Sequence, residues 1–156
     1  IPFFVSKIKN GEDIPLTDDE MTRFIISPQE AVQLVFDSLI YGKGGEVFVP
    51  KLPSFRIIDL IEILKEKYNS DSKVKVIGIR PGEKINESMI NEAEARRTYD
   101  FKDMYVITSE INKIQDAEYL KSGKKLAKKD MTHYSSDQNL VSKEEVKKIF
   151  KKLSII

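Results

Sequence analysis

The stretch VIGIRPGEKINESMI, residues 76–90, runs from an apolar strand pattern into a charged turn and back to apolar residues. Pro81 fixes the backbone at the corner, and Gly82 lets the backbone and a ligand approach each other closely. A turn that only reversed the chain would need these two residues and not the three charged residues around them. Those charged residues are Arg80, Glu83 and Lys84. Either they are solvated, or they bind a ligand.

Two arginines are candidates for binding an anion. Arg80 follows a predicted strand, where a planar guanidinium can donate two parallel hydrogen bonds to a phosphate or carboxylate. Four residues recur by chance, so the motif alone favours a solvated turn with an Arg–Glu pair. Arg23, in MTRFIIS, lies between an acidic turn and an apolar segment. Its guanidinium either projects to a ligand or pairs with the acidic residues before it. Those residues are Asp18, Asp19 and Glu20.

The composition is that of a globular chain without bulk affinity for polyanions. Of the 156 residues, 40% are apolar and 33% are charged, and 26 basic against 25 acidic residues leave a net charge of +1. This balance gives no electrostatic reason to expect nucleic acid or an anionic membrane as a partner. No apolar run approaches the roughly 20 residues that span a bilayer. The absence of cysteine excludes a disulfide framework, a thiolate zinc site and a cysteine nucleophile, and it favours a cytoplasmic location.

The chain begins inside an apolar run, IPFFV, without a methionine or a signal-peptide pattern. Exposed Phe3 and Phe4 would be unusual, because large apolar side chains are normally covered. We therefore expect residues 1–156 to be a fragment of a longer chain, with residues 1–5 packed against the missing part. The expected divisions are core strands and helices over 1–109, a polar tail over 110–141 and a terminal helix over 142–156.

Helical periodicity and capping residues predict an α/β arrangement in which helices alternate with strands. Helices are expected over 2–10, from Ser27 and from Ser142 with capping boxes, from Ser54 as an N-cap, and as a short turn over 92–97. Strands are expected over 14–17, 22–27, 45–50, 73–79 and 104–109. The buried faces are expected to be Ala31, Val32, Leu34, Val35 and Leu39; Ile57, Ile58, Leu60, Ile61 and Leu64; and Val146, Ile149, Phe150 and Leu153. In the helix after Ser54, Asp59 is expected to face water.

Two other features are expected to lie on the surface. His133 is the only histidine, and a single histidine without a second histidine or cysteine makes a poor metal site. No nucleophile or carboxylate has a fixed relation to it. The basic run has no interleaved aromatic residues and is flanked by acidic ones, so a solvated face is the safer interpretation. Its lysines are Lys121, Lys124, Lys125, Lys128 and Lys129.

The sequence lacks the signature of a dinucleotide site. Gly42, Gly44 and Gly45 follow a predicted helix and precede a strand, which is the reverse of the order that a dinucleotide fingerprint requires. No tyrosine is followed by a lysine four residues later. We therefore expect no nucleotide-cofactor site in this chain.

Five segments taken in order resemble one family: IPFF, TDDEMTRFIIS, GGEVFVPKLPS, IGIRPGEKINESMI and YSSDQN. They look like the C-terminal half of the UDP-N-acetylglucosamine 4,6-dehydratases (inverting). These are extended short-chain dehydrogenases/reductases of bacterial flagellin-glycan and capsular-polysaccharide pathways. The resemblance covers about residues 1–140, and MTRF followed by RPGEK is far more specific than either segment alone. It implies the substrate-binding C-terminal portion of an α/β protein, with short strands and packed helices, whose Rossmann half is absent from this chain.

The resemblance also implies roles for individual residues. Arg23 and Arg80 would both reach the diphosphate of a UDP-sugar, whose two negative charges two guanidinium groups can neutralise. The backbone around Pro15 and Thr17 would meet the uracil. The full implied substrate-binding set is Pro15, Thr17, Arg23, Arg80, Glu83 and Lys84.

Within that set, Glu83 would orient Arg80 or touch the ribose, and Lys84 belongs to the same GEK segment. The family usually has histidine where this chain has Asn86, which leaves the role of that side chain open. No catalytic, cofactor-binding or metal-binding residue is implied in this chain.

The activity implied by the resemblance is that of an NADP-dependent lyase acting on UDP-N-acetylglucosamine or a related UDP-sugar. Oxidation at C4, loss of water across C5 and C6, return of hydride to C6 and inversion at C5 would give a 4-keto-6-deoxy sugar nucleotide. The missing N-terminal half would hold NADP, the glycine-rich loop and a Tyr-x-x-x-Lys pair, so this fragment alone is expected to be inactive. The full-length protein is expected to be a homo-oligomer. The alternatives are a sibling UDP-sugar epimerase, a non-inverting dehydratase, or a nucleotide-sugar binding or assembly module without catalysis.

Overall fold

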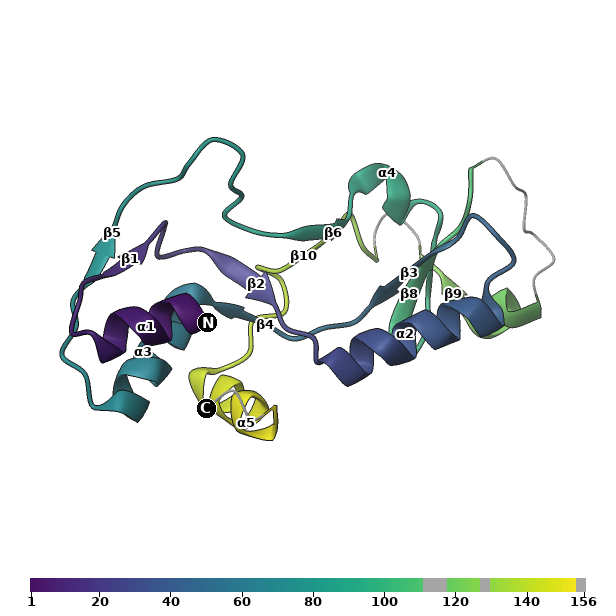
Figure 1. The fold of residues 1–156 in the computed structure, drawn as a ribbon. Helices are drawn as coiled ribbons and strands as arrows, with labels where there is room; N and C mark the ends of the chain where they lie inside the picture. Colours follow the sequence, from purple (N-terminus) through teal and green to yellow (C-terminus); the bar gives the residue numbers. More distant parts are fainter. Residues whose placement is uncertain (111–117, 127–129, 154–156) are drawn as a thin grey trace. The chain divides into compact units, whose positions relative to one another are not determined.

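The computed structural model describes residues 1–110, 118–126 and 130–153. The chain forms two compact units, and each is built from segments that are distant in sequence. Unit 1 comprises Ile1–Ile25, Pro53–Glu87 and Ser136–Ile156, and unit 2 comprises Ile26–Leu52 and Ser88–Ser135. Short strands and helices alternate in both units, so the predicted mixed α/β class is confirmed (Figure 1).

Unit 1 contains three helices and two pairs of strands among its described residues. The helices are α1 (Pro2–Lys9), α3 (Ile57–Tyr68) and α5 (Lys143–Lys152). The strands are β1 (Ile14–Leu16), β2 (Thr22–Phe24), β4 (Ser54–Arg56) and β5 (Val74–Val76). Strand β1 pairs with β5 in parallel, and β2 pairs with β4 antiparallel.

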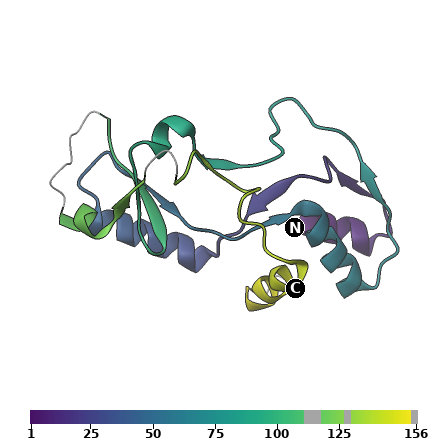
Figure 2. The ribbon, with the colours of Figure 1, turned by 180° about the vertical axis from the view of Figure 1, so that it is seen from behind.

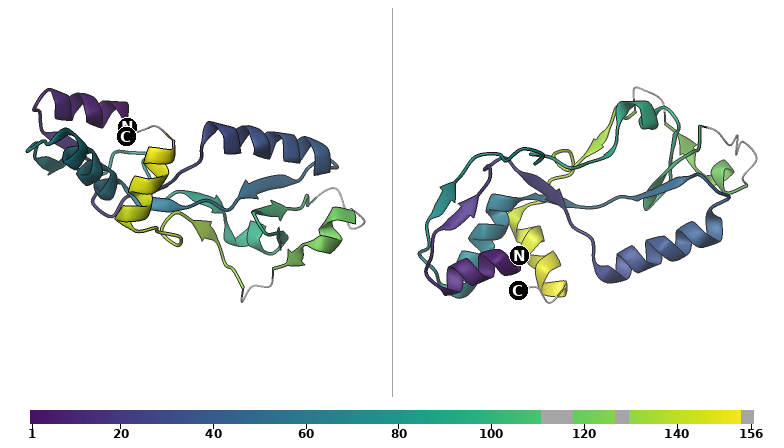
Figure 3. Two further views of the ribbon diagram at one scale, coloured as in Figure 1. Left: turned by 90° about the horizontal axis from the view of Figure 1, so that it is seen from below. Right: turned by 45° about the horizontal axis from the view of Figure 1, so that its top comes forward.

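The core of unit 1 lies where α1, α3 and α5 meet β1 and β4. Figure 3 shows these three helices gathered on one side of the unit. Phe150 of α5 is fully buried and meets the Phe55 ring edge-on, with centroids 5.5 Å apart and an interplanar angle of 84°. The other buried apolar residues are Ile8, Ile14, Leu16, Leu60, Ile61, Ile63, Leu64 and Val146. Because α5 completes this core, the terminal helix is part of unit 1, as its apolar stripe predicts.

The predicted start of α3 is wrong. Ser54 is a strand residue of β4, its hydroxyl is buried without a hydrogen-bond partner among the described residues, and Arg56 occupies the N-cap position. Asp59 was expected to face water but is buried. Both of its carboxylate oxygens accept hydrogen bonds from Arg56, at 3.0 and 2.8 Å. The pair, in the first turn of the helix, explains why a charge is tolerated there.

The apolar run over residues 73–79 forms a much shorter strand than predicted. Strand β5 covers only Val74–Val76, and Val76, Ile77 and Ile79 are exposed. The reason is that its sheet has two strands among the described residues, so β1 covers one edge of β5 and no described strand covers the other. The expected buried strand before Arg80 is therefore incorrect.

Unit 2 is organised around a four-stranded antiparallel sheet of order β3-β8-β7-β9. Its strands are β3 (Val47–Pro50), β7 (Thr98–Asp100), β8 (Met104–Ile107) and β9 (Lys124–Lys125). A second pair joins β6 (Ser88–Ile90) to β10 (Tyr134–Ser135). The helices are α2 (Pro28–Tyr41), α4 (Glu92–Ala95) and the 3₁₀ helix η1 (Glu118–Ser122). Figure 2 shows these elements from behind.

Lys51, at the end of β3, links the strands of unit 2. Its ammonium donates to the Asp100 carboxylate at 2.5 Å and lies 4.8 Å from the centre of the Tyr105 ring. Burial raises the pKa of Tyr105 above its ordinary value. Beside it, the Tyr134 hydroxyl accepts from the Leu52 N–H at 2.8 Å and donates to the Leu52 carbonyl at 3.2 Å. The segment VPKLP is thus held to the sheet through both side chain and backbone.

Helix α2 begins at the predicted capping box of Ser27 and Glu30, but its predicted buried face is wrong. Ala31 and Leu34 are half-buried. Five other apolar side chains at helical spacing are each more than half exposed: Val32, Val35, Phe36, Leu39 and Ile40. The periodicity correctly gives a helix with one apolar face, and no described residue of unit 2 covers that face.

The basic run and the polar tail lie partly beyond the described residues, including Lys128 and Lys129. In the described part, Lys124 pairs with Asp130 at 3.8 Å, and His133 is exposed, with its Nδ1 3.0 Å from the Thr132 hydroxyl. No described helix has the length and apolar character needed to cross a membrane. Within the same residues, no group of histidine or carboxylate side chains is arranged to hold a metal ion.

Candidate functional site

The turn Arg80–Glu83 is closed by two hydrogen bonds. The Glu83 N–H donates to the Arg80 carbonyl at 3.0 Å, and the Glu83 carboxylate accepts from the Arg80 N–H at 3.1 Å. Pro81 and Gly82 occupy the central positions, and Gly82 has φ +86°, the conformation that the second central residue of a type II turn requires. The charged residue Glu83 therefore binds the backbone of Arg80.

The Arg80 side chain is exposed and makes no hydrogen bond or ion pair with any described residue. All N–H donors of its guanidinium are therefore available to a ligand. The Arg80 backbone is fixed, because both its carbonyl and its N–H are hydrogen-bonded to Glu83. Lys84 is exposed as well. The structure thus presents two cations side by side in sequence, one with a planar donor set and one with a point charge.

Arg23 lies on β2, and its guanidinium is used within unit 1. Its Nη1 donates to the Thr22 carbonyl at 2.6 Å and to the Ile85 carbonyl at 2.9 Å, and its Nη2 donates to the Lys84 carbonyl at 3.0 Å. Its Nε lies 3.5 Å from a carboxylate oxygen of Glu87. The side chain therefore fastens residues 84–87 to β2.

A buried hydroxyl pair fastens the same segment from the other side of β2. The Glu87 N–H donates to Ser136 Oγ at 2.9 Å, Ser136 Oγ lies 2.5 Å from Thr22 Oγ1, and Thr22 Oγ1 donates to Asn86 Oδ1 at 2.8 Å. The Thr22 and Ser136 side chains are both buried. The chain of donors has one direction, because Thr22 gives its proton to Asn86 and must accept from Ser136. Asn86 is thereby oriented with its amide NH₂ away from Thr22.

Pro15 and Thr17 are placed separately from these anchors. Pro15 is half-buried in β1 opposite Lys75 of β5, and Thr17 follows the end of that strand. No hydrogen bond or ion pair among the described residues joins either of them to Arg23 or Arg80. The structure brings Arg23, Lys84 and the turn of Arg80 together through the backbone of residues 84–87.

A hollow of about 730 Å³ in unit 1 lies beside this segment. Its lining is strongly acidic, because five carboxylates face one arginine that is already paired with Asp59. The lining residues include Asp19, Glu20, Asp59, Glu62, Asp137 and Arg56. Such a hollow repels a diphosphate, so the exposed guanidinium of Arg80 is the better anion site.

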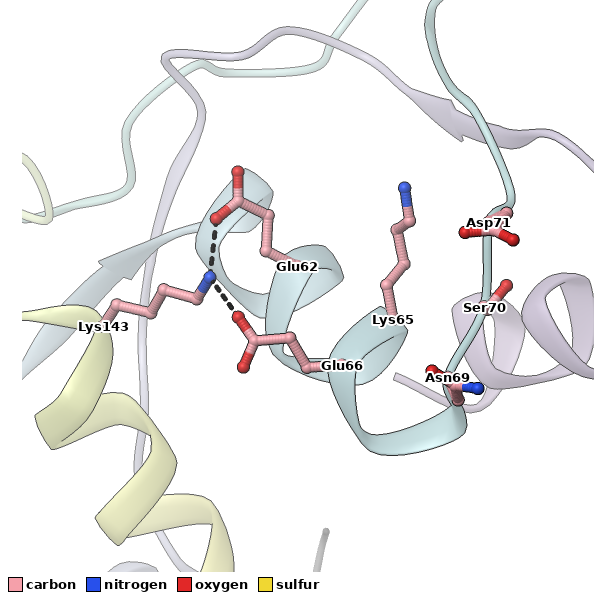
Figure 4. Close-up of a pocket in the computed structure, with 7 residues that line it drawn as sticks. All are labelled: Glu62, Lys65, Glu66, Asn69, Ser70, Asp71 and Lys143. Atoms are coloured by element: carbon pink, nitrogen blue, oxygen red, sulfur yellow. Dashed lines mark hydrogen bonds and ion pairs between the residues drawn. The ribbon is translucent and has the colours of Figure 1, made fainter.

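A second polar hollow, of about 330 Å³, lies between α3 and α5 (Figure 4). In Figure 4 the Lys143 side chain of α5 points to Glu62 and Glu66 of α3, with distances of 2.8 and 2.6 Å. Lys147 adds a contact of 2.6 Å to Glu66. Hydrogen bonds from Lys143 and then Lys147 lower the pKa of Glu66 to about 2. These internal pairs account for the charges of Glu62, Glu66 and Lys143 in the hollow.

The glycine-rich loop after α2 already binds a carboxylate of the chain itself. Glu46 accepts from the Lys43 N–H at 3.0 Å and from the Gly44 N–H at 2.8 Å. The loop also runs from a helix into a strand, the order that was expected from the sequence. Its backbone amides are therefore not arranged to receive a dinucleotide pyrophosphate.

Comparison with known proteins places the turn in a family context. Residues 1–109 match the sequence profile of the family described as "Polysaccharide biosynthesis protein". The chain belongs to this family. The matched region contains both β2 with Arg23 and the turn of Arg80.

Proteins with different names and activities resemble this chain. UDP-N-acetylglucosamine 4,6-dehydratase (inverting) of Campylobacter jejuni is 40% identical over 89% of this chain and 42% of its own length. "Uncharacterized membrane protein MJ1061" of Methanocaldococcus jannaschii is 39% identical over 100% of this chain and 46% of its own. UDP-glucose 4-epimerase of Rickettsia rickettsii is 31% identical over 100% of this chain and 46% of its own. The predicted resemblance to the inverting dehydratases is confirmed.

The fold also has a solved counterpart. The X-ray structure of Pen from Bacillus thuringiensis superposes with a TM-score of 0.84 and 29% sequence identity, over 99% of this chain and 46% of that chain. This family member thus spans less than half the length of each of these relatives.

Proposed function

We propose that the full-length protein is a cytoplasmic nucleotide-sugar lyase, a UDP-N-acetylglucosamine 4,6-dehydratase that inverts C5, and that this chain binds the UDP-sugar. The observation that carries the proposal is the unpaired guanidinium of Arg80 on a doubly closed turn. A diphosphate is the group that best matches a planar, exposed set of donors next to a lysine. The similarity to the Campylobacter dehydratase supports the choice of reaction.

The role proposed for each residue of the site follows from the hydrogen-bonding groups and the charge that it exposes. Arg80 binds the diphosphate, Glu83 holds the Arg80 backbone in place, and Lys84 adds positive charge. The backbone around Pro15 and Thr17 is proposed to meet the uracil. The sequence pattern in which MTRF precedes RPGEK supports this set.

The chemical step is assigned to a part of the protein outside this chain. The described residues offer no strand-to-helix glycine turn, and the amides of the glycine-rich loop bind Glu46. We therefore place NADP, which would carry the hydride, in an N-terminal Rossmann half. The role of this chain is to orient the sugar nucleotide.

The exposed apolar faces support the presence of that second half. Helix α2 presents five apolar side chains in one stripe, and Phe3 of α1 is also more than half exposed. A soluble protein rarely leaves such surfaces uncovered. The relatives are more than twice as long as the region they share with this chain, so a covering segment of the same polypeptide is the proposed occupant.

The experiment is incubation of the purified full-length protein with UDP-N-acetylglucosamine and NADP, with the product analysed by NMR. A 4-keto-6-deoxy product with inverted C5 is expected. Retention at C5 would assign a non-inverting dehydratase, and a C4 epimer with an intact C6 hydroxyl would assign an epimerase. Binding of UDP without any turnover would leave a nucleotide-sugar binding module and refute the enzymatic proposal.

A further inference from the structure

The guanidinium of Arg23 is committed to the chain itself. Its three hydrogen bonds all go to backbone carbonyls, those of Thr22, Lys84 and Ile85. Its Nε faces Glu87 at 3.5 Å. Of the five N–H donors of an arginine, four are therefore directed at protein oxygens, which leaves at most one for a ligand.

The carbonyls that Arg23 binds follow the turn of Arg80 directly. Residues 80–83 form the turn, and residues 84 and 85 accept from the guanidinium. The Thr22 N–H also donates to the Ile85 carbonyl at 3.0 Å. The Ile85 carbonyl is thus bound by the backbone of Thr22 and by the side chain of Arg23, which are adjacent residues of β2. These bonds fix the backbone just after the turn of Arg80 on β2.

The other end of the segment is fixed as firmly. The Glu87 N–H donates to Ser136 Oγ, and the Ser136 N–H donates to the Glu87 carbonyl, both at 2.9 Å. With Arg23 absent, the backbone of residues 84 and 85 would lose two of its three contacts to β2 while Glu87 stayed attached. The backbone of residues 84 and 85 would then be more mobile, and this backbone directly follows the turn of Arg80.

We propose that Arg23 is a positioning residue, which holds residues 84–87 on β2 so that Arg80 meets the diphosphate, and that it does not itself supply a second diphosphate contact. This proposal rests on the proposed binding of a UDP-sugar by Arg80. A guanidinium suits the task because its planar donors reach two adjacent carbonyls and a carboxylate at once. A lysine in its place could reach only part of this set.

The test is a double-mutant cycle for binding of UDP to the full-length protein, measured by calorimetry. We expect Arg23→Ala to weaken UDP binding about tenfold, since misplacing a charged donor costs about as much as losing one charge-assisted hydrogen bond. In an Arg80→Ala background, Arg23→Ala should change UDP affinity by less than about twofold, because it acts only through Arg80. A further loss of about tenfold in that background would make Arg23 a direct ligand and overturn the proposal.

Hydrogen exchange without any ligand provides a second, independent measurement. Arg23→Ala should speed exchange of the Glu83 amide and leave the Glu87 amide, α1 and α3 unchanged, whereas unchanged exchange at Glu83 would overturn the proposal. The control is Arg96→Ala, which removes an exposed arginine paired with Glu92 at 3.5 Å in unit 2 and should alter neither UDP affinity nor this exchange.

If Arg23→Ala does not fold, Arg23→Lys replaces it, with a smaller expected increase in exchange at the Glu83 amide and the same background test. Failure of wild-type protein to bind UDP would refute the proposed function. The exchange result would still decide whether Arg23 holds the segment, so the two failures are distinguishable.

Discussion

Thr22 and Ser136 share a buried hydrogen bond of 2.5 Å although 114 positions separate them in the chain. Through this bond β2, the segment containing Asn86 and Glu87, and the segment that leads to α5 are joined at one point. The turn of Arg80 is therefore supported by residues from three distant parts of the sequence.

Thr22→Val should destabilise the protein by about 1–3 kcal/mol, because the buried hydroxyl of Ser136 would lose its acceptor and the half-buried Asn86 would lose its donor. The unfolding free energy from urea titration measures this. The matched control is Thr132→Val, at an exposed position, which should change it by less than about 0.5 kcal/mol. Equal effects of the two substitutions would show that the buried network contributes nothing to stability.

Arg80→Lys should weaken UDP binding by the full-length protein about tenfold or more, because the charge remains while the two-pronged geometry is lost. NADP affinity should hardly change, since the cofactor is assigned to the other half. Calorimetric titration of UDP checks the first statement and NADPH fluorescence the second. Wild-type UDP affinity in the Arg80→Lys variant would show that this turn is solvated and does not bind the diphosphate through the guanidinium.

Glu66 should make stability depend on pH in the acid range. Its folded-state pKa of about 2 lies below its ordinary value of 4.5, so its pairs with Lys143 and Lys147 stabilise the fold above pH 4.5. That contribution is lost as the pH falls from 4.5 toward 2. Urea unfolding across this range should show a shallower decline for Glu66→Gln than for wild type.

The lysines provide the cross-check on Glu66. Replacing Lys143 and Lys147 together by methionine removes the same ion pairs and should flatten the acid decline in the same manner. Because 49% of the Glu66 side chain is exposed, the effect should also shrink in high salt. Parallel curves for wild type and both variants would contradict the assignment.

Val35→Ser with Leu39→Ser should destabilise the full-length protein by at least about 2 kcal/mol, because a covered apolar face loses buried area. The control is Gln33→Ser on the same helix, at a position outside the apolar stripe, with an expected change below about 0.5 kcal/mol. Thermal unfolding of the two variants compares them directly. If the double substitution is as mild as the control, the face of α2 is bare in the complete protein.

Elements with local signals were predictable from the sequence. The capping boxes at Ser27 and Ser142 satisfy helix N-termini with residues three positions away, so the sequence contains the whole motif. Ser54 shows the limit of such a signal. Its environment depends on pairing of β4 with β2 and on contacts with residues 139 and 141, which no local pattern reveals.

Distant pairing explains what else was missed. Strands β6, β7, β9 and β10 are two or three residues long and were not predicted, since each exists only through its partner, as Ser135 does opposite Ser88. The candidate cations could be named from the sequence because MTRF and RPGEK are recognisable. The sequence could not show that the Arg23 guanidinium is bound by the chain itself while that of Arg80 is unpaired among the described residues. The carbonyls that bind Arg23 belong to residues about sixty positions further along.

The interleaving of the two units has a consequence for synthesis on the ribosome. The chain passes from unit 1 to unit 2 and back twice, so neither unit corresponds to a continuous stretch that could fold as soon as it emerges. The core of unit 1 includes Val146 and Phe150, so α1 and α3 lack their third helix until these residues have been translated. Until then the apolar faces of α1 and α3 are incompletely covered, and they are open to chaperones and to aggregation.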